Sequence, residues 1–152
     1  MSSNQILKAE ESVSTPTHGP PNHILVVDDD VGILQLSARI LTISSYHVDT
    51  AEDGVAAWEA LHASSYNPLI TDHNMPKVSG VELVKKMRSA RMTIPVVLSS
   101  SAIPMDELNR NPSLQLATTL FKPFTMDALL GTVEKVLSAS TGSTPCAGSA
   151  LP

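Results

Sequence analysis

Short apolar runs alternate with amphipathic segments along the middle of the chain, and this pattern predicts strands and helices in turn. The run HILVV at 23–27 is continuous and rich in β-branched residues, which is typical of a strand covered on both faces. Further runs predict strands at 46–51, 68–72, 94–100 and 117–121. The segments after the strands carry apolar residues three or four apart, which predicts helices at 33–43, 54–63, 80–90, about 105–111 and 125–138.

Five strand–helix units in succession predict one sheet. Right-handed crossovers between parallel strands place helices on both faces of the sheet. The expected fold class is therefore α/β, a doubly wound five-stranded parallel sheet with five helices. In such sheets the ligand site lies beyond the carboxyl ends of the strands.

The ends of the chain differ in composition from its middle. The 152 residues, 42% of them hydrophobic, suit a single domain with a core. Residues 1–21, which include PTHGPP, and residues 139–152, which read ASTGSTPCAGSALP, bury too little surface to offset their ordering entropy. We therefore expect disordered tails at 1–21 and 139–152 around a folded domain at 22–138.

Charge and cysteine content exclude several classes of protein. Fifteen Asp and Glu oppose ten Lys and Arg, which argues against a nucleic-acid-binding surface. The single cysteine, Cys146, allows no intrachain disulfide and fits a reducing compartment. No apolar stretch approaches the roughly 20 residues of a membrane span, and the N-terminus lacks the pattern of a signal peptide. A cytoplasmic protein with no membrane or nucleic-acid partner is expected.

Polar side chains gather at the ends of four predicted strands, so they are expected to meet at one edge of the sheet. They are Asp28, Asp29 and Asp30 after the first strand, Asp72 at the end of the third, Ser99, Ser100 and Ser101 at the fourth, and Lys122 after the fifth.

Several carboxylates in one pocket disfavour simultaneous ionisation unless a cation intervenes. A few oxygen ligands with room for water suit Mg²⁺, and such metal sites commonly handle phosphate. Lys122 adds a positive charge opposite the acids, and Ser100 adds a hydroxyl donor. An aspartate in these surroundings is placed to attack a phosphoryl group and hold it as an acyl phosphate.

Four motifs resemble those of the receiver domains of two-component response regulators. ILVVDDD, LITDHNMPKVSG, VVLSSSA and FKPF match in order and spacing, over about residues 22–138. The resemblance implies the flavodoxin-like (CheY-like) fold with strand order 2-1-3-4-5. It also implies phosphorelay signalling, in which an aspartate accepts a phosphoryl group.

The resemblance assigns roles to the acidic residues. Asp72, before HNMP, matches the phosphoacceptor, and Asp29 matches the direct Mg²⁺ ligand. Asp28 matches the acid that supports the metal, often through water. Asn74 stands two residues beyond the acceptor, where the family uses a backbone carbonyl as a further metal ligand.

The resemblance assigns roles to the later strand ends as well. Ser100 matches the hydroxyl that moves onto the phosphoryl group, and Lys122 matches the lysine of that site. The Lys-Pro bond at Pro123 is expected to be cis, as in the family. Asn74 and Ala102 occupy the two positions that usually tune dephosphorylation.

Some positions depart from the family pattern. Ser79 stands where an aspartate often precedes Gly80, and Thr119 stands where an aromatic residue often serves as a rotating switch. The usual Gly-Ala before the fifth strand is absent. Asn111-Pro112 is expected to end or kink the fourth helix, because proline cannot continue it. These changes spare the phosphorylation site, and those in the fourth helix and fifth strand alter the signalling face that these two elements form.

Other interpretations of the same residues remain open. The acids after the first strand could serve as helix caps, and Asp30 is the best candidate for that role. DDDVG also offers the Asp-x-Asp of haloacid-dehalogenase-like phosphatases, with Asp28 as nucleophile and Asp30 as acid, although Gly32 departs from that signature. A third alternative is a phosphorylation-independent interaction module. His73 is expected to point away from Asp72 and to have a structural or surface role.

The predicted protein is a phosphoacceptor and acts on no separate substrate, although it catalyses its own phosphorylation and slow dephosphorylation. About 14 residues follow the last predicted helix, too few for an output domain, so a stand-alone receiver or a phosphorelay intermediate is expected. The expected phosphoryl donor is a sensor histidine kinase or a histidine phosphotransfer protein. A downstream protein target and a monomeric or weakly dimeric state are expected.

Overall fold

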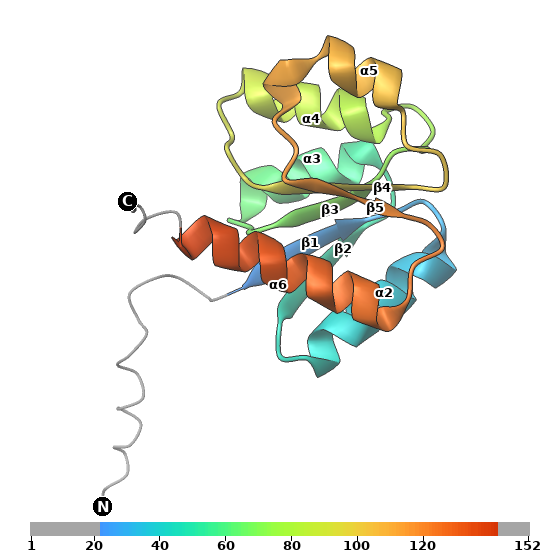
Figure 1. The fold of residues 1–152 in the computed structure, drawn as a ribbon, viewed down its shortest axis with the longest axis vertical. Helices are drawn as coiled ribbons and strands as arrows, with labels where there is room; N and C mark the ends of the chain where they lie inside the picture. The colour runs from blue at the N-terminus through green and yellow to red at the C-terminus, as the bar shows by residue number, and fades with distance from the viewer. Residues whose placement is uncertain (1–21, 143–152) are drawn as a thin grey trace, which may run out of the picture.

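The computed structural model describes residues 22–142, and they form a five-stranded parallel sheet with helices on both faces (Figure 1). The strand order is β2-β1-β3-β4-β5, so the predicted doubly wound topology is confirmed. The strands are β1 His23–Val27, β2 His47–Ala51, β3 Leu69–Asp72, β4 Val96–Ser100 and β5 Thr118–Phe121. The helices are α2 Val31–Ile43, α3 Gly54–Ala63, α4 Gly80–Ser89, α5 Met105–Arg110, the 3₁₀ helix η1 Pro112–Leu114 and α6 Met126–Gly142.

Two hydrophobic layers hold the helices on the sheet. Alternate residues of a strand point to opposite faces, so β1 sends Leu25 and Val27 into one layer and Ile24 and Val26 into the other. The first layer lies under α3 and α4, and the second lies under α2 and α6 (Figure 1). The central strands are therefore covered on both faces. No described helix is long and apolar enough to span a membrane.

Side-chain caps begin α2 and α4. The Asp30 carboxylate accepts a hydrogen bond from the Ile33 backbone N–H at 3.2 Å, so the predicted capping role is confirmed. Ser79 and Glu82 form a reciprocal capping box at α4. The serine that replaces the family's aspartate before Gly80 therefore has a local structural function.

The predicted end of α5 is confirmed, whereas the predicted end of α6 is not. Asn111-Pro112 ends α5, as expected, and Pro112 opens η1. The end predicted for the last helix at 138 is wrong, because α6 continues to Gly142. No proline or glycine stands between 138 and 142 to stop the helix. The predicted C-terminal tail at 139–152 therefore begins too early, because residues 139–142 are helical. The N-terminal tail at 1–21 and residues 143–152 lie outside the described residues.

Arg88 connects α4 to the segment that follows α5. Its guanidinium donates hydrogen bonds to four backbone carbonyls, those of Leu114, Met92, Ile94 and Gln115, at 2.8 to 3.4 Å. Burial lowers the pKa of Arg88. This one side chain therefore satisfies carbonyl groups of two segments, Met92 and Ile94 after α4 and Leu114 and Gln115 at the end of η1.

Arg88→Met is therefore expected to destabilise the domain by about 2 kcal/mol, because the carbonyls lose their donors while the side-chain volume is nearly kept. In thermal unfolding the midpoint should fall by several degrees. Lys85→Met, at an exposed position of the same helix, is the control and should change little. Equal midpoints for the two variants would show that the bonds contribute nothing.

Candidate metal and phosphoryl-transfer site

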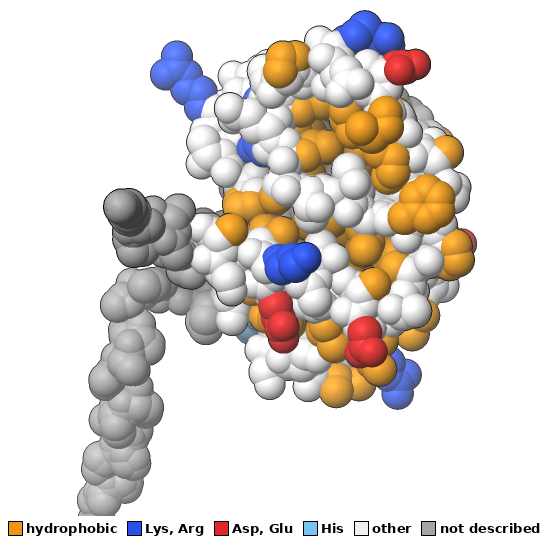
Figure 2. Space-filling view, viewed as in Figure 1, with side chains coloured by type: hydrophobic (Ala, Val, Ile, Leu, Met, Phe, Trp, Pro, Cys, Tyr) orange, Lys and Arg blue, Asp and Glu red, His pale blue; other side chains and the backbone are white. Residues whose placement is uncertain are grey.

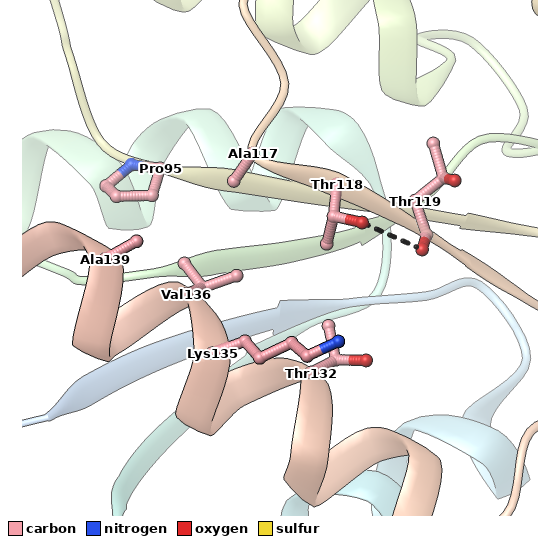
Figure 3. Close-up of a pocket in the computed structure, with 8 residues that line it drawn as sticks. All are labelled: Pro95, Ala117, Thr118, Thr119, Thr132, Lys135, Val136 and Ala139. Carbon is pink, nitrogen blue, oxygen red and sulfur yellow. Dashed lines mark hydrogen bonds between the residues drawn. The ribbon is translucent and has the colours of Figure 1, made fainter.

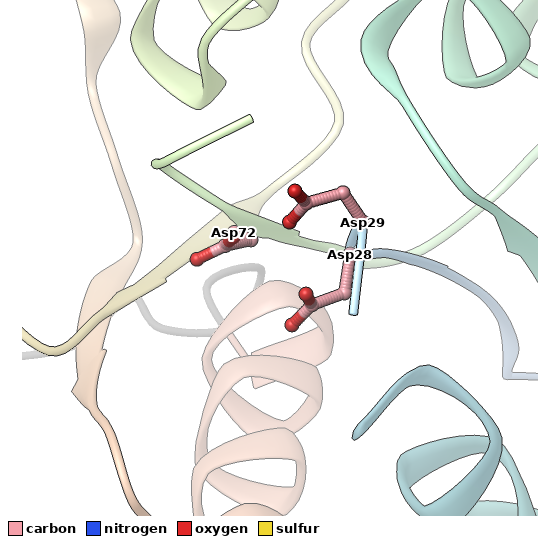
Figure 4. A group of neighbouring side chains, drawn as sticks. All are labelled: Asp28, Asp29 and Asp72. Carbon is pink, nitrogen blue, oxygen red and sulfur yellow. The ribbon is translucent and has the colours of Figure 1, made fainter. Parts of the chain in front are cut away.

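Three carboxylates meet at the carboxyl edge of the sheet. Asp28 and Asp29 directly follow β1, and Asp72 is the last residue of β3. These two strands are neighbours in the sheet, with Val27 opposite Thr71, so the residues that follow come together. One carboxylate oxygen of each residue lies within 4.8 Å of the other two (Figure 4). The structure thus places together the three acids predicted to hold a metal.

The three acids differ in their access to water. Asp28 and Asp72 are 3% and 4% exposed, whereas Asp29 is exposed. A buried carboxylate is costly unless a cation or hydrogen bonds compensate it. The cluster therefore has a buried base and an open side at Asp29, through which a hydrated ion or a phosphoryl group can approach.

Lys122 supplies a positive charge to the buried pair. Its Nζ donates hydrogen bonds to Asp28 Oδ2 at 2.7 Å and to Asp72 Oδ1 at 3.1 Å. Its backbone N–H donates to the Ser100 carbonyl at 2.9 Å, which fixes the start of the loop after β5. The peptide bond between Lys122 and Pro123 is cis. Lys122 therefore reaches the acids from a strand that does not adjoin theirs.

Burial and charge shift the protonation of this pair in the folded state. Burial raises the pKa of Asp72, the negative charges of Asp28 and Asp29 raise it further, and the bond from Lys122 opposes the rise. Burial alone lowers the pKa of Lys122, but the bonds to Asp28 and Asp72 outweigh it, and the pKa is raised. The Asp72 carboxylate is thus held in surroundings that favour neutralising its charge.

The Ser100 hydroxyl faces its own loop. Ser100 is fully buried, and its Oγ donates to the Ala102 carbonyl at 2.9 Å. It accepts hydrogen bonds from the Ala102 N–H at 3.1 Å and from Asn74 Nδ2 at 3.3 Å. The predicted switch hydroxyl is therefore bonded to both residues predicted to tune dephosphorylation.

Gly80 brings α4 directly against the acceptor. A Cβ at this position would lie 2.5 Å from the Asp72 carbonyl oxygen and 2.9 Å from the His73 Cα. The Gly80 N–H donates to the His73 carbonyl at 2.9 Å. Only glycine permits this approach, so the residue fixes the β3–α4 connection behind the acid.

His73 is turned toward α5. Its Nε2 lies 3.9 Å from Glu107 Oε1, and its buried Nδ1 has no partner within residues 22–142. The structural role expected for His73 agrees with this position. Glu107 was not predicted, because nothing local in the sequence links a residue of α5 to the acceptor loop.

Thr119 lies apart from the carboxylates. It is exposed on β5 and lines a hollow of about 670 Å³ between β5 and α6 (Figure 3). It also borders a second hollow, of about 330 Å³, beside η1. The structure therefore places this predicted switch position on the outer edge of the sheet, with open space on either side of it.

Asp30 does not join the cluster. Its carboxylate caps α2, and its backbone N–H donates to Asp28 Oδ1 at 2.9 Å. In the phosphatase interpretation Asp30 would be the general acid beside the nucleophile Asp28. The observed geometry instead holds Asp28 with Lys122 and gives Asp30 a helix cap, which disfavours that interpretation.

The donor set fits Mg²⁺. Three carboxylates, two of them buried and one exposed, offer hard oxygen ligands and leave positions for water and phosphoryl oxygens. The repulsion among the acids supplies a reason to bind a cation. The Asn74 carbonyl, the fourth predicted ligand, remains a prediction, while the Asn74 side chain is committed to Ser100.

Mg²⁺ is expected to raise the melting temperature of the parent protein, because a ligand that binds only the folded state stabilises it by mass action. At 100 times its dissociation constant the gain is about 2.7 kcal/mol. Asp29→Ala should remove most of this gain and should not destabilise the metal-free protein, because it relieves repulsion. Thermal scans with and without Mg²⁺ provide the measurement. An unchanged Mg²⁺ response in Asp29→Ala would exclude Asp29 as a ligand.

The fold and this acidic site together point to a signalling domain of the receiver class. The model of the response regulator receiver domain family matches residues 24–134, and the chain belongs to that family. It is 34% identical to the sensor protein EvgS of Escherichia coli (strain K12) over 84% of this chain and 11% of EvgS. It is 30% identical to the response regulator MprA of Mycobacterium ulcerans over 75% of this chain and 49% of MprA. The chain thus spans a tenth to a half of the length of these curated relatives.

Solved structures agree with this assignment. The chemotaxis protein CheY4 of Vibrio cholerae has a TM-score of 0.70 and 28% identity, covering 75% of this chain and 97% of that chain. The response regulator TrrA of Thermotoga maritima, in complex with Mg²⁺ and BeF, has a TM-score of 0.68 and 28% identity, covering 76% and 98%. The flavodoxin-like, CheY-like fold is therefore shown, as is a role in two-component signalling.

Proposed function

We propose that this domain accepts a phosphoryl group on Asp72 in a Mg²⁺-dependent reaction, from a phosphohistidine of a sensor kinase or of a histidine phosphotransfer protein. The observation that carries the proposal is the contact of Lys122 Nζ with the buried Asp72 carboxylate, 3.1 Å away, beside the oxygens of Asp28 and Asp29. A phosphoryl group on Asp72 would meet a fixed cation there.

The residues divide the work of the transfer. Lys122 holds Asp72 Oδ1, so Oδ2 is the oxygen that bonds to phosphorus as the phosphorus–nitrogen bond of the donor breaks. The bonding electrons leave with the imidazole. When bound by Asp28, Asp29 and Asp72, Mg²⁺ offsets the charge of the phosphoryl oxygens. Preorganised charge of this kind needs no rearrangement during the reaction.

The signal is expected to leave the site through the loop after β4. If the Ser100 hydroxyl rotates onto the phosphoryl group, its bonds to Ala102 and Asn74 break. The next helix, α5, has no fully buried residue, so it can shift at small cost. Apolar side chains are exposed on the surface that includes α5 and β5, among them Met105 and Phe121 (Figure 2). We propose that a downstream protein binds this face.

Intact-mass spectrometry after incubation with acetyl phosphate and Mg²⁺ tests the proposed function. One added phosphoryl group per chain is expected, and chelation of the metal with EDTA should prevent its addition. A chain that stays unmodified under both conditions would instead support a phosphorylation-independent module.

Ala102 is expected to set the lifetime of the acyl phosphate. Its backbone is bonded to the Ser100 hydroxyl, and its methyl group is exposed and leaves the approach to the site open. Ala102→Tyr should slow hydrolysis severalfold by shielding the phosphorus from in-line water. Decay of the phosphorylated protein after donor removal is the measurement, with Ser65→Tyr, in an exposed distant loop, as the control. Equal decay in parent and Ala102→Tyr would show that residue 102 does not face the phosphoryl group.

A further inference from the structure

Positive charge is concentrated in and beside one helix of an acidic protein. The segment 77–91, which contains α4, carries five of the chain's ten basic residues and a single acidic residue, Glu82. The whole chain has a formal net charge of −5. The basic residues are Lys77, Lys85, Lys86, Arg88 and Arg91. Arg88 is committed to backbone carbonyls, whereas Lys85 and Lys86 are exposed on the outer side of α4.

These two lysines border an open hollow beside a tryptophan. The hollow, of about 400 Å³, lies between α3 and α4 and is lined by Trp58, Lys85, Lys86, Ser89 and Ala90. Its lining differs in charge from the carboxylate cluster, because it contains two lysines and no acidic residue. Trp58 is partly buried and packs against the hydrophobic core, so the core holds its ring in position beside the hollow.

The side chains around the hollow are held in place. Lys86 Nζ lies 4.8 Å from the centroid of the Trp58 ring, which is a cation–π contact. The His62 ring packs edge-on against the same Trp58 ring, with the two ring centroids 4.6 Å apart. Glu82 lies one turn from Lys86, but its carboxylate accepts the Ser79 N–H in the capping box. Within residues 22–142 neither Lys85 nor Lys86 forms an ion pair.

We propose that this α3–α4 surface, defined by Trp58, Lys85 and Lys86, is a docking site for an acidic segment of a partner protein. Carboxylates of the segment would pair with the two lysines, and an apolar side chain would pack on the part of the indole that remains exposed. Tryptophan at the centre of a charged rim is the composition of a binding hot spot. Nucleic acid fits less well, because two exposed lysines neutralise few phosphates and the net negative charge of the chain repels the others.

The surface is independent of the phosphorylation chemistry. It lies on the outer side of α4, whereas the N-terminal end of that helix, at Gly80, packs against the Asp72 backbone. Binding at Lys85 and Lys86 therefore needs no phosphoryl group. Charge reversal of both lysines should leave labelling of Asp72 by acetyl phosphate unchanged, which separates failure of this proposal from failure of the proposed function.

The test selects short random peptides displayed on phage against the parent protein, with counter-selection on the Lys85→Glu/Lys86→Glu variant. Enriched peptides are then synthesised and titrated. Trp58 is the only tryptophan of the chain, so its fluorescence reports binding at this surface directly. The expected peptides combine several acidic residues with a large apolar residue. Their affinity should fall about tenfold or more in the charge-reversed variant and should weaken as salt rises.

The matched control is Lys135→Glu, which makes the same kind of charge change at an exposed position of α6. It should bind the selected peptides about as well as the parent does. Three results would overturn the proposal: no enrichment over the charge-reversed variant, enrichment of basic or uncharged peptides, or equal affinity in the parent and the charge-reversed variant. A fluorescence change with a short oligonucleotide, dependent on the two lysines and not produced by the acidic peptides, would also overturn it.

Discussion

Lys122→Met is expected to be strongly destabilising in the absence of Mg²⁺. The substitution keeps most of the side-chain length but removes the cation that bonds Asp28 at 2.7 Å and Asp72 at 3.1 Å. Two nearly buried carboxylates would then face each other without compensation. Removing one partner of a buried ion pair typically costs about 3–5 kcal/mol. Urea unfolding in metal-free buffer measures the loss as a lower midpoint.

The stabilisation that Lys122 contributes is also expected to depend on pH. The acids raise the pKa of Lys122 above its ordinary value of 10.5, so the contact stabilises the folded state below that value. The stabilisation is lost as pH rises through the raised pKa. The difference in unfolding free energy between parent and Lys122→Met should therefore shrink in strongly alkaline buffer.

Lys135→Met is the matched control for Lys122→Met, because Lys135 is exposed on α6. It should leave the midpoint nearly unchanged. Mg²⁺ should restore part of the stability of Lys122→Met, since a cation returns to the acids. Equal midpoints for the two lysine variants would contradict the assignment of Lys122 as the counter-ion of the site.

Asp72→Asn is expected to abolish phosphorylation by acetyl phosphate. An amide is a poor nucleophile and forms no acyl phosphate, so labelling should fall by about a hundredfold or more. Intact mass provides the readout. Asp30→Asn is the control, because asparagine also caps a helix and Asp30 lies outside the carboxylate cluster. Labelling of Asp72→Asn at the parental level would exclude Asp72 as the acceptor.

Much of the fold and of the acidic cluster could be predicted from the sequence, because both depend on local patterns. Continuous apolar runs mark strands that are buried on both faces, as β1 and β3 are. Parallel strands then place their carboxyl ends together, which brings Asp28 and Asp29 to Asp72. The capping role of Asp30 followed from its position before an apolar periodic segment.

Other features depend on contacts between distant segments. Arg88 resembles any surface arginine of a helix until η1 brings the Leu114 and Gln115 carbonyls to it. The hollow beside Trp58 requires the packing of α3 on α4. The rotamer of Ser100 is likewise set by a loop whose course the sequence does not specify. The extra turn of α6 reflects the absence of a stop signal before Gly142. Composition alone placed the end of this helix too early, at residue 138.

The position of the acyl phosphate is the most direct test of the central claim. Reduction of the phosphorylated protein with borohydride converts the modified aspartate to homoserine, and peptide mapping by mass spectrometry locates it. The receiver mechanism predicts homoserine at position 72 and an unmodified position 28, because both carboxylate oxygens of Asp28 already accept hydrogen bonds, from the Asp30 N–H and from Lys122 Nζ. Homoserine at position 28 would contradict the mechanism and support a phosphatase that uses Asp28 as its nucleophile.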